Sequence, residues 1–324
     1  MYNFTIFSTT SDYYDAAYHD ITNLSNVDYI RNIFETNSIF LKICFKINYY
    51  FQGKIFPSNP LKSILNRFLF KSKFDNDHPI CFVFTERVLF LYNYGFIDFL
   101  RTSHPNAKFV CYLQDIGETV ENVHLESIFN EFDLSISYDK REAEKYNILY
   151  YPTPYSFYPF KEKKKLQQSD VFFVGRAKNR LNDIIKSYEK LTQMGLSCDF
   201  HITDVDPKNQ KYSEVINYNT RLTYKENLEH VKNTKCILEV MQKGATGYSL
   251  RTWEAIFYDK LLLTNNKTIN QAPFYNNKYI FIYESSKDFD ERFHVNSKMR
   301  INYYYKEKLN PKYFLDFIEI NLKQ

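Results

Sequence analysis

The feature that most constrains the fold is an alternation of short, β-rich apolar runs with amphipathic helical segments, which occurs twice along the chain. In the first half we expect strands at residues 2–7, 80–84, 108–113, 134–137 and 148–150, with helices at about 87–101 and 139–146. In the second half we expect strands at 171–174, 198–203, 236–240, 260–264 and 279–283, with helices at 178–194, 224–231 and 249–258. Strands that alternate with helices indicate a mostly parallel α/β sheet in each half.

A stretch that contains prolines and lysines separates the two halves. Pro152, Pro154 and Pro159 are followed by the polar run 161–169, whose low apolar content is typical of a linker. We therefore expect one domain over 1–155, a linker over 156–169, a second domain over 170–310 and a closing helix over 311–324, with a proline in its first turn. A length of 324 residues fits two domains of ~100–200 residues each.

Scarce glycine and scattered cysteine argue against several classes of protein. The chain has 7 glycines and contains neither G-x-G-x-x-G nor G-x-x-x-x-G-K-[ST], so a standard dinucleotide-binding enzyme or P-loop NTPase is not expected. Its 5 cysteines form no C-x-x-C pair and most lie in apolar runs, which predicts a reducing compartment, no disulfide framework and no zinc site. We also expect no signal peptide and no membrane-spanning helix, because the first residues lack a signal pattern and no run of about 18 apolar residues occurs.

A block of positive charge lies inside an otherwise acidic first half. Residues 36–74 hold no acid and seven bases, whereas the rest of 1–155 holds 18 acids and seven other bases. Apolar residues at helical spacing accompany four of these bases, which are Lys62, Arg67, Lys71 and Lys73. We interpret the block as a surface that rests on anionic lipid, with a core-facing helix pair carrying solvated lysines as the alternative. Nucleic acid is a weaker interpretation, because the other charges of this half repel phosphates.

The residues just beyond the predicted strands are binding candidates, because open α/β sheets bind ligands at the carboxyl ends of their strands. Gly175 ends the strand at 171–174, and three bases follow it, namely Arg176, Lys178 and Arg180. Glycine permits a tight turn, and the start of a helix attracts anions. The pattern therefore suits a diphosphate; in the alternative, two of the three bases only cover the outside of the helix.

A second candidate loop follows the strand at 236–240 and contains two of the seven glycines. Ser249 is predicted to cap the next helix, whose buried stripe is expected to be Leu250, Trp253 and Phe257. Glu254 lies at the edge of that stripe, where a carboxylate needs a partner. The two hydroxyls of a ribose or sugar diol fit its two oxygens, and an internal ion pair with Arg251 or Arg176 is the alternative.

The order of these motifs resembles the donor-binding half of bacterial GT-B-fold glycosyltransferases that build lipopolysaccharide, capsule or other surface glycans. The motifs are Phe-Val-Gly-Arg at 173–176, Tyr-Lys-Glu-Asn-Leu at 224–228, Ile-Leu-Glu-Val-Met-Gln at 237–242, Leu-Arg-Thr-Trp-Glu-Ala at 250–255 and the run at 260–266. In the first half, residues 137–146 and the pair Tyr151-Pro152 look like the end of the acceptor domain of the same group. The resemblance thus covers roughly residues 105–285.

The resemblance implies a Leloir enzyme with two Rossmann-like domains that face a cleft, the acceptor on residues 1–155 and the nucleotide-sugar donor on 170–310. Arg176 and either Lys178 or Arg180 would face the diphosphate, and Glu254 would hold the ribose hydroxyls. The loop that approaches the phosphate and sugar would contribute Gln242, Gly244, Gly247, Ser249 and Arg251. Such folds use no metal and no cofactor, since basic residues neutralise the leaving diphosphate.

Two motifs of related enzymes need separate comment. Asp204-Val205-Asp206 has the letters of a metal-binding D-x-D, but it precedes a proline in a polar stretch and is interpreted as a loop. The E-x(7)-E pair of some GT-B enzymes is absent, because Glu239 and Glu254 are fifteen residues apart.

Transfer with inversion at the sugar also requires a general base. Asp115, which follows the strand at 108–113, is the best-placed candidate, and Asp12 and Glu86 are alternatives. Four histidines show no spacing typical of a triad or metal pair and are given structural roles; they are His19, His104, His124 and His201.

The leading hypothesis is therefore a cytoplasmic glycosyltransferase that acts on a lipid-linked surface glycan at the inner face of the membrane, with no nucleic-acid partner. A non-catalytic nucleotide- or sugar-binding partner of a glycan assembly complex is one alternative, and a two-domain nucleotide-sugar epimerase is another.

Overall fold

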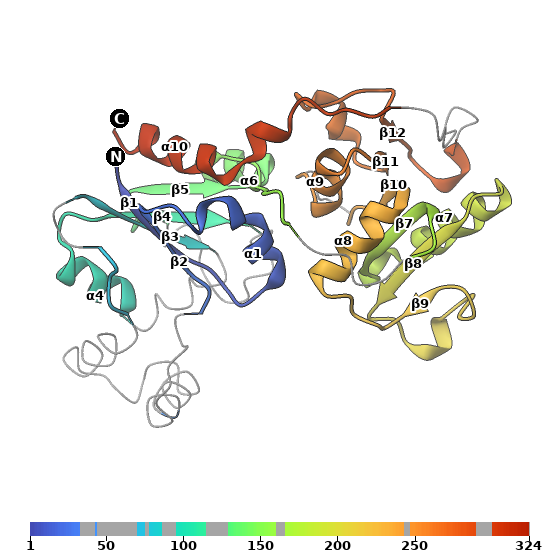
Figure 1. The fold of residues 1–324 in the computed structure, drawn as a ribbon, viewed down its shortest axis with the longest axis horizontal. Helices are drawn as coiled ribbons and strands as arrows, with labels where there is room; N and C mark the ends of the chain where they lie inside the picture. Colours follow the sequence, from blue (N-terminus) through green and yellow to red (C-terminus); the bar gives the residue numbers. More distant parts are fainter. Residues whose placement is uncertain are drawn as a thin grey trace. The chain divides into compact units, whose positions relative to one another are not determined.

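A computed structural model describes residues 1–32, 43, 70–74, 78–85, 95–114, 129–159, 166–242, 247–289 and 300–323. The chain divides into two compact units (Figure 1). The first unit comprises Met1–Ser156 together with Asn310–Gln324, and the second comprises Phe157–Leu309. The closing helix, which the sequence did not assign to either domain, therefore belongs with the first unit.

The first unit is built on a six-stranded parallel sheet in the order β2-β1-β3-β4-β5-β6. Its strands are β1 (Asn3–Phe7), β2 (Val27–Ile30), β3 (Ile80–Thr85), β4 (Lys108–Leu113), β5 (Leu134–Ser137) and β6 (Leu149–Tyr150). The central strands β3 and β4 are buried on both faces, so they are near-continuous apolar runs rather than alternating ones.

Helices cover the two faces of the first sheet (Figure 1). On one face, α4 (Phe96–Ser103) packs in an aromatic cluster with Phe7, Phe82 and Phe84. On the other face, α1 (Asp12–Ala17) and the C-terminal helix α10 (Pro311–Asn321) pack together in a second cluster. A further helix of this unit, α6 (Lys140–Tyr146), contacts β5 and β6.

The second unit has its own six-stranded parallel sheet in the order β12-β11-β10-β7-β8-β9. The strands are β7 (Ser169–Arg176), β8 (Cys198–Thr203), β9 (Asn217–Tyr218), β10 (Thr234–Glu239), β11 (Leu261–Thr264) and β12 (Ile280–Ile282). The helix α7 (Leu181–Gln193) packs in the main apolar cluster of this unit, while α8 (Tyr224–Asn233) and α9 (Leu250–Phe257) contact β10 and its neighbouring strands.

The predicted alternation is confirmed, with three differences in detail. The sequence did not predict the short strands β2 and β9. The helix expected from residue 178 begins at Leu181, because Lys178 has a φ of 46° and lies in a separate 3-10 turn. The helix expected at 87–101 is described only as α4, since residues 86–94 lie outside the described part.

Half of the proposed lipid-binding bases lie in the described part of the chain. Lys71 and Lys73 are exposed, and the Lys73 ammonium donates a hydrogen bond of 3.2 Å to the Val27 carbonyl. Lys62 and Arg67 lie outside the described residues. None of the described helices is both long enough and apolar enough to cross a bilayer.

Candidate functional site

The strand order of the second sheet predicts where a ligand site lies. The strand β7 is the first of this unit, and the chain continues to β8 on one side of it and later to β10 on the other. The order therefore reverses between β7 and β10, and open α/β sheets bind ligands in the crevice at such a switch point, beyond the carboxyl ends of the strands. The segments that leave β7 and β10 are the two that the sequence had singled out.

Two arginines lie at this switch point. Arg251, in the first turn of α9, donates a hydrogen bond of 2.9 Å from Nε to the carbonyl of Val174 in β7, and a second from Nη2 to the same oxygen. Arg180, just before α7, donates from Nη1 to the carbonyl of Val240 after β10, and from Nη2 to that of Arg176 at 3.1 Å. The two guanidinium groups thus cross-link the ends of both strands.

These two positive charges have no carboxylate partner within ion-pair distance among the described residues. Burial, together with the nearby charge of Arg251, lowers the pKa of Arg180 to about 10. The carboxylate of Glu239 opposes this shift from beyond ion-pair distance, and a desolvated cation whose hydrogen bonds go to carbonyl oxygens keeps part of its charge uncompensated. The arrangement therefore favours binding of an anion that carries more than one charge.

Gly175 makes the close approach of Arg251 possible. A Cβ atom at residue 175 would lie 2.7 Å from Nη2 of Arg251, a distance that real Cβ atoms essentially never show. The sequence predicted that this glycine permits a tight turn. The structure adds that its missing side chain leaves the space that the Arg251 guanidinium occupies.

The other two predicted bases of this segment lie on the surface. The side chain of Arg176 is 63% exposed and forms an ion pair through Nε with Asp204, the first acid of the D-x-D letters. Lys178 is exposed as well. Arg180 and Arg251 are therefore the bases that the structure brings together, while Arg176 lies beside Asp204.

A buried carboxylate, Glu239, fixes the start of α9 to the sheet. This last residue of β10 is 1% exposed and accepts hydrogen bonds from three hydroxyls, those of Ser249, Thr252 and Thr264. Ser249 is also the N-cap of α9 and accepts a hydrogen bond of 3.1 Å from the N–H of Arg251. Glu239 therefore positions the helix turn that carries Arg251, a role that sequence reasoning missed.

The two asparagines after β11 hold the loop between β10 and α9 at both of its described ends. The Oδ1 atom of Asn265 accepts a hydrogen bond of 2.6 Å from the N–H of Met241, and Nδ2 of Asn266 donates one of 3.3 Å to the carbonyl of Gly247. Gln242 is half-buried at the near end of this loop, and Gly244 lies outside the described residues.

Glu254 is more deeply buried than the sequence predicted. The residue is only 2% exposed. The predicted buried stripe of α9 was Leu250, Trp253 and Phe257, but Leu250 and Phe257 are only half-buried. The buried residues of α9 instead run from Thr252 to Ile256. The Oε1 atom of Glu254 accepts a hydrogen bond of 2.7 Å from the Asn227 amide of α8, and Glu254 forms no ion pair with Arg251 or Arg176. Burial raises the pKa of Glu254 to about 7, although Arg251, Asn227 and Tyr224 oppose that shift.

The predicted general base cannot be placed. Asp115 and its alternative Glu86 lie outside the described residues. The other alternative, Asp12, is the first residue of α1 and lies 3.7 Å from Arg31. The role of Asp115 therefore stays a prediction.

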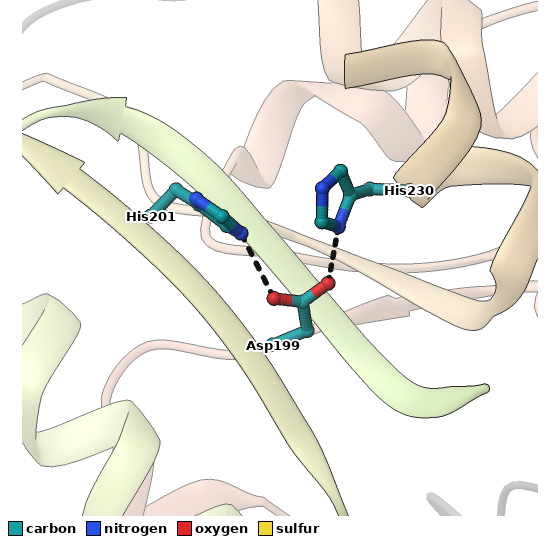
Figure 2. A group of neighbouring side chains, drawn as sticks. All are labelled: Asp199, His201 and His230. Atoms are coloured by element: carbon teal, nitrogen blue, oxygen red, sulfur yellow. Dashed lines mark hydrogen bonds and ion pairs between the residues drawn. The ribbon is translucent and has the colours of Figure 1, made fainter. Parts of the chain in front are cut away.

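A second polar cluster, away from the two arginines, consists of Asp199 and His201 of β8 with His230 of α8 (Figure 2). Burial favours the neutral acid, but hydrogen bonds from both histidines outweigh it and hold the pKa of Asp199 well below its usual range. A structural role was predicted for His201, because no residue at the spacing of a triad or metal pair accompanies it in the sequence. The available signal was the pair Asp199-x-His201 within a strand, since alternate residues share one face.

Comparison with known proteins establishes the class of fold. No protein-family model matches the chain, and no curated protein matches it by sequence. Among solved structures, an α-glucosyltransferase in complex with UDP and DNA aligns with a TM-score of 0.56 at 11% identity, over 99% of both chains. A UDP-forming α,α-trehalose-phosphate synthase from Burkholderia vietnamiensis aligns with a TM-score of 0.55 at 10% identity, over 100% of this chain and 97% of that one.

A third solved structure, the lipopolysaccharide outer core galactosyltransferase WaaB, aligns with a TM-score of 0.50 at 13% identity, over 98% of both chains. Identities this low establish the fold alone. The chain has the GT-B fold of glycosyltransferases, as its sequence motifs predicted, and two sheets of six parallel strands build it.

Proposed function

We propose that the protein is a glycosyltransferase that moves a sugar from a nucleotide-sugar donor, a nucleoside diphosphate sugar, to a hydroxyl of a lipid-linked surface glycan. The observation that carries this proposal is the pair Arg180 and Arg251, two cations at the switch point of the sheet whose described partners are carbonyl oxygens. A diphosphate supplies the two negative charges that this pair lacks.

In the reaction, the bond between the sugar carbon and the diphosphate oxygen breaks as the acceptor oxygen bonds to that carbon. The nucleoside diphosphate leaves with an additional negative charge, which Arg180 and Arg251 stabilise in a partly desolvated site. If the configuration inverts, the acceptor proton passes to a base, the role proposed for Asp115. Arg176 and Lys178 would approach the outer phosphate, and no metal is required for this step.

Glu254 is proposed to accept hydrogen bonds from the ribose hydroxyls. A carboxylate offers about four acceptor positions, and Asn227 and Tyr224 of α8 occupy two of them. Two further donors from a ribose would stabilise the ionised form of a carboxyl group that burial otherwise keeps near neutrality. The loop with Gln242, Gly244 and Gly247 would approach the sugar and phosphate.

The first test is a thermal-shift and calorimetric screen with UDP, GDP, CDP, CMP and dTDP. UDP is the leading candidate, because one structural neighbour was solved with UDP and another is a UDP-forming enzyme. A nucleotide at 100 times its Kd stabilises the protein by about 2.7 kcal/mol, which is easily detected. If none of the five nucleotides stabilises the protein, the donor site proposed here is wrong.

The variant Arg251→Met directly tests whether the pair Arg180 and Arg251 binds the diphosphate. A charge-assisted hydrogen bond contributes about 1.5–3 kcal/mol, so we expect the affinity for the nucleotide to fall roughly 10- to 100-fold. Arg101→Met is the matched control, because Arg101 pairs with Glu131 in the first unit and should leave the affinity unchanged. Equal effects of the two variants would contradict the proposal.

The dependence of donor turnover on an acceptor distinguishes a glycosyltransferase from a binding partner and from an epimerase. A glycosyltransferase releases the nucleoside diphosphate faster when a glycolipid acceptor is present, whereas an epimerase turns over the donor alone and a binding partner does neither. The measurement is nucleotide release from the donor that the screen selects, with and without membrane extract.

The basic block at 36–74 is proposed to bring the enzyme to an anionic membrane. Each lysine or arginine near such a surface contributes about 1 kcal/mol, and the attraction weakens with salt. We expect sedimentation with phosphatidylserine liposomes at low salt, and its loss when Lys62, Arg67, Lys71 and Lys73 are all changed to Glu. Retention on duplex DNA but not on liposomes would favour the nucleic-acid interpretation instead.

A further inference from the structure

We propose that Asp199, His201 and His230 form a binding site for a divalent transition-metal ion, with Zn²⁺ as its reference ligand. One nitrogen of each imidazole and one carboxylate oxygen can serve as ligands, and these atoms all lie within 4.8 Å of one another. Figure 2 shows both rings directed at the same carboxylate. This inference does not depend on the proposed transferase activity.

The spacing of the three groups is close to that of a loaded site. Nε2 of His201 lies 2.9 Å from one oxygen of Asp199, and Nδ1 of His230 lies 2.5 Å from the other. In a tetrahedral zinc site with bonds of about 2.0–2.1 Å, neighbouring ligand atoms are about 3.3 Å apart. The two nitrogens contact different oxygens of Asp199, so binding of one ion requires these hydrogen bonds to open and the three ligand atoms, now within 4.8 Å of one another, to converge on it; the backbone that carries them is already in place.

The backbone holds the cluster together without an ion. Asp199 and His201 alternate along β8 and so share the face that looks toward α8, where His230 lies one turn after Asn227. The ring of His230 also stacks on Phe172 of β7, with centroids 5.3 Å apart and an interplanar angle of 12°. The free energy of ion binding therefore does not have to bring the ligand residues together.

As a set of hydrogen bonds alone, the cluster is incomplete. The side chain of His201 is 8% exposed, and its Nδ1 atom is buried without a hydrogen-bond partner in the described part of the chain. Leaving a buried polar atom unpaired is costly, and native structures rarely do so without a reason. A metal bond at Nε2 would replace the hydrogen bond of that nitrogen to Asp199 and would leave Nδ1 unpaired, but as the stronger interaction it would offset the cost of the unpaired atom.

The donor set and the exposure indicate which ions fit. Two imidazoles with one carboxylate suit Zn²⁺, Co²⁺ and related ions, whereas Mg²⁺ and Ca²⁺ prefer oxygen ligands. The side chain of Asp199 is 24% exposed, more than either ring, so solvent reaches the cluster from the carboxylate side. Three protein ligands with one position left for water is the pattern of an exchangeable site rather than a closed structural one.

A bound ion would join α8 to the sheet, because its ligands come from β8 and α8. The helix α8 also carries Asn227, which donates to Glu254. We therefore expect the ion to raise the melting temperature of the whole protein and to bind whether or not a nucleotide is present.

The experiment uses the full chain, stripped with chelator and then titrated with Co²⁺ and, separately, with Zn²⁺. We expect one Co²⁺ per chain, with the intense visible absorption of a four-coordinate site, displacement of Co²⁺ by Zn²⁺, and a melting temperature raised by several degrees in Zn²⁺. His201→Gln and His230→Gln should each lower the affinity by at least 100-fold, while His78→Gln, which alters an exposed histidine of the first unit, should leave it unchanged.

Two results would overturn the proposal. One is Co²⁺ that stays six-coordinate in the wild-type protein, a readout that needs no variant and is independent of folding defects. The other is stoichiometric binding that survives both His201→Gln and His230→Gln, which would place the ion elsewhere. Asp199→Asn adds a check, since it keeps the volume of the side chain. It should weaken Co²⁺ binding while both imidazole ligands stay in place.

Discussion

In the first unit the buried carboxylates Asp139 and Glu142 serve the start of one helix, whereas in the second unit the buried carboxylates Glu239 and Glu254 connect separate elements. Asp139 caps α6 by accepting hydrogen bonds from the N–H groups of residues 141 and 142, and Glu142 accepts one of 2.6 Å from Ser137. Glu239 instead joins α9 to β10 and β11, and Glu254 connects α9 to α8.

This difference separates two uses of a buried charge. A carboxylate whose partners come from the next few residues completes a local structure and calls for no ligand. A carboxylate that links several elements is a different case. Where it lies near two arginines that have no carboxylate within ion-pair distance among the described residues, it indicates a site that a bound ligand completes. The two sheets differ in strand order, but each is parallel, has six strands and has a switch point beside its first strand, so the fold alone does not reveal which unit binds the donor.

The largest expected effect tests the network of Glu239. Glu239→Ala leaves the hydroxyls of Ser249, Thr252 and Thr264 without their acceptor inside a buried site, which should lower the free energy of unfolding by about 3–5 kcal/mol. Glu142→Ala in the first unit removes the acceptor of Ser137 and should cost about 1–2 kcal/mol. Urea denaturation of both variants measures the two losses.

The conservative variant Glu239→Gln keeps the volume and one acceptor oxygen, so it should recover part of the loss. If Glu239→Ala costs no more than Glu142→Ala, the distinction between the two kinds of buried carboxylate fails.

The next effect is a pH dependence that belongs to Glu254. Its pKa is about 7 in the folded protein against an ordinary value of 4.5, so the folded state binds more protons than the unfolded state between these values. Stability therefore falls as pH rises from 4.5 to 7, by about 1.36 kcal/mol per pKa unit. Relative to Glu254→Gln, the wild type should lose about 2–3 kcal/mol between pH 5 and pH 8.

Nucleotide binding reports on the same carboxyl group. Ribose hydroxyls that donate to Glu254 favour its ionised form, so binding at pH 6.5 to 7 should release protons, and Glu254→Gln should abolish the release. Calorimetry in two buffers of different ionisation enthalpy measures it. Binding without proton release in the wild type would mean that the ribose does not contact Glu254.

The sequence was sufficient for the elements and for the position of the donor loops, because these depend on local patterns. The strand that leads into Gly175 and Arg176 and the cap at Ser249 could be predicted from neighbouring residues alone. Glu239, which lies within the strand predicted at 236–240, gave no local sign of its role, since its three hydroxyl partners come from positions 10 to 25 residues later.

The same limit applies to the charged pairs. Arg176 was predicted to face the phosphate because it follows the strand directly, yet Asp204, 28 residues later, is its partner. The spatial pairing of Arg180 with Arg251 and of His201 with His230 depends on which strands are neighbours in the sheet. That order is a property of the folded chain and not of any short motif.

The smallest expected effect decides whether Arg176 belongs to the donor site or only to the surface. Its ion pair with Asp204 is exposed, and such pairs contribute about 0–1 kcal/mol, so Arg176→Ala should leave stability within that range. If the side chain turns from Asp204 to the diphosphate when the nucleotide binds, Arg176→Ala should lower the affinity about tenfold, since it removes one charge-assisted contact. Asp204→Ala should act in the opposite direction, because Arg176 then gives up no ion pair on binding. Calorimetric titration of both variants with UDP measures the two changes, and affinities that stay at the wild-type value in both would assign Arg176 to the surface and leave Arg180 and Arg251 as the bases of the donor site.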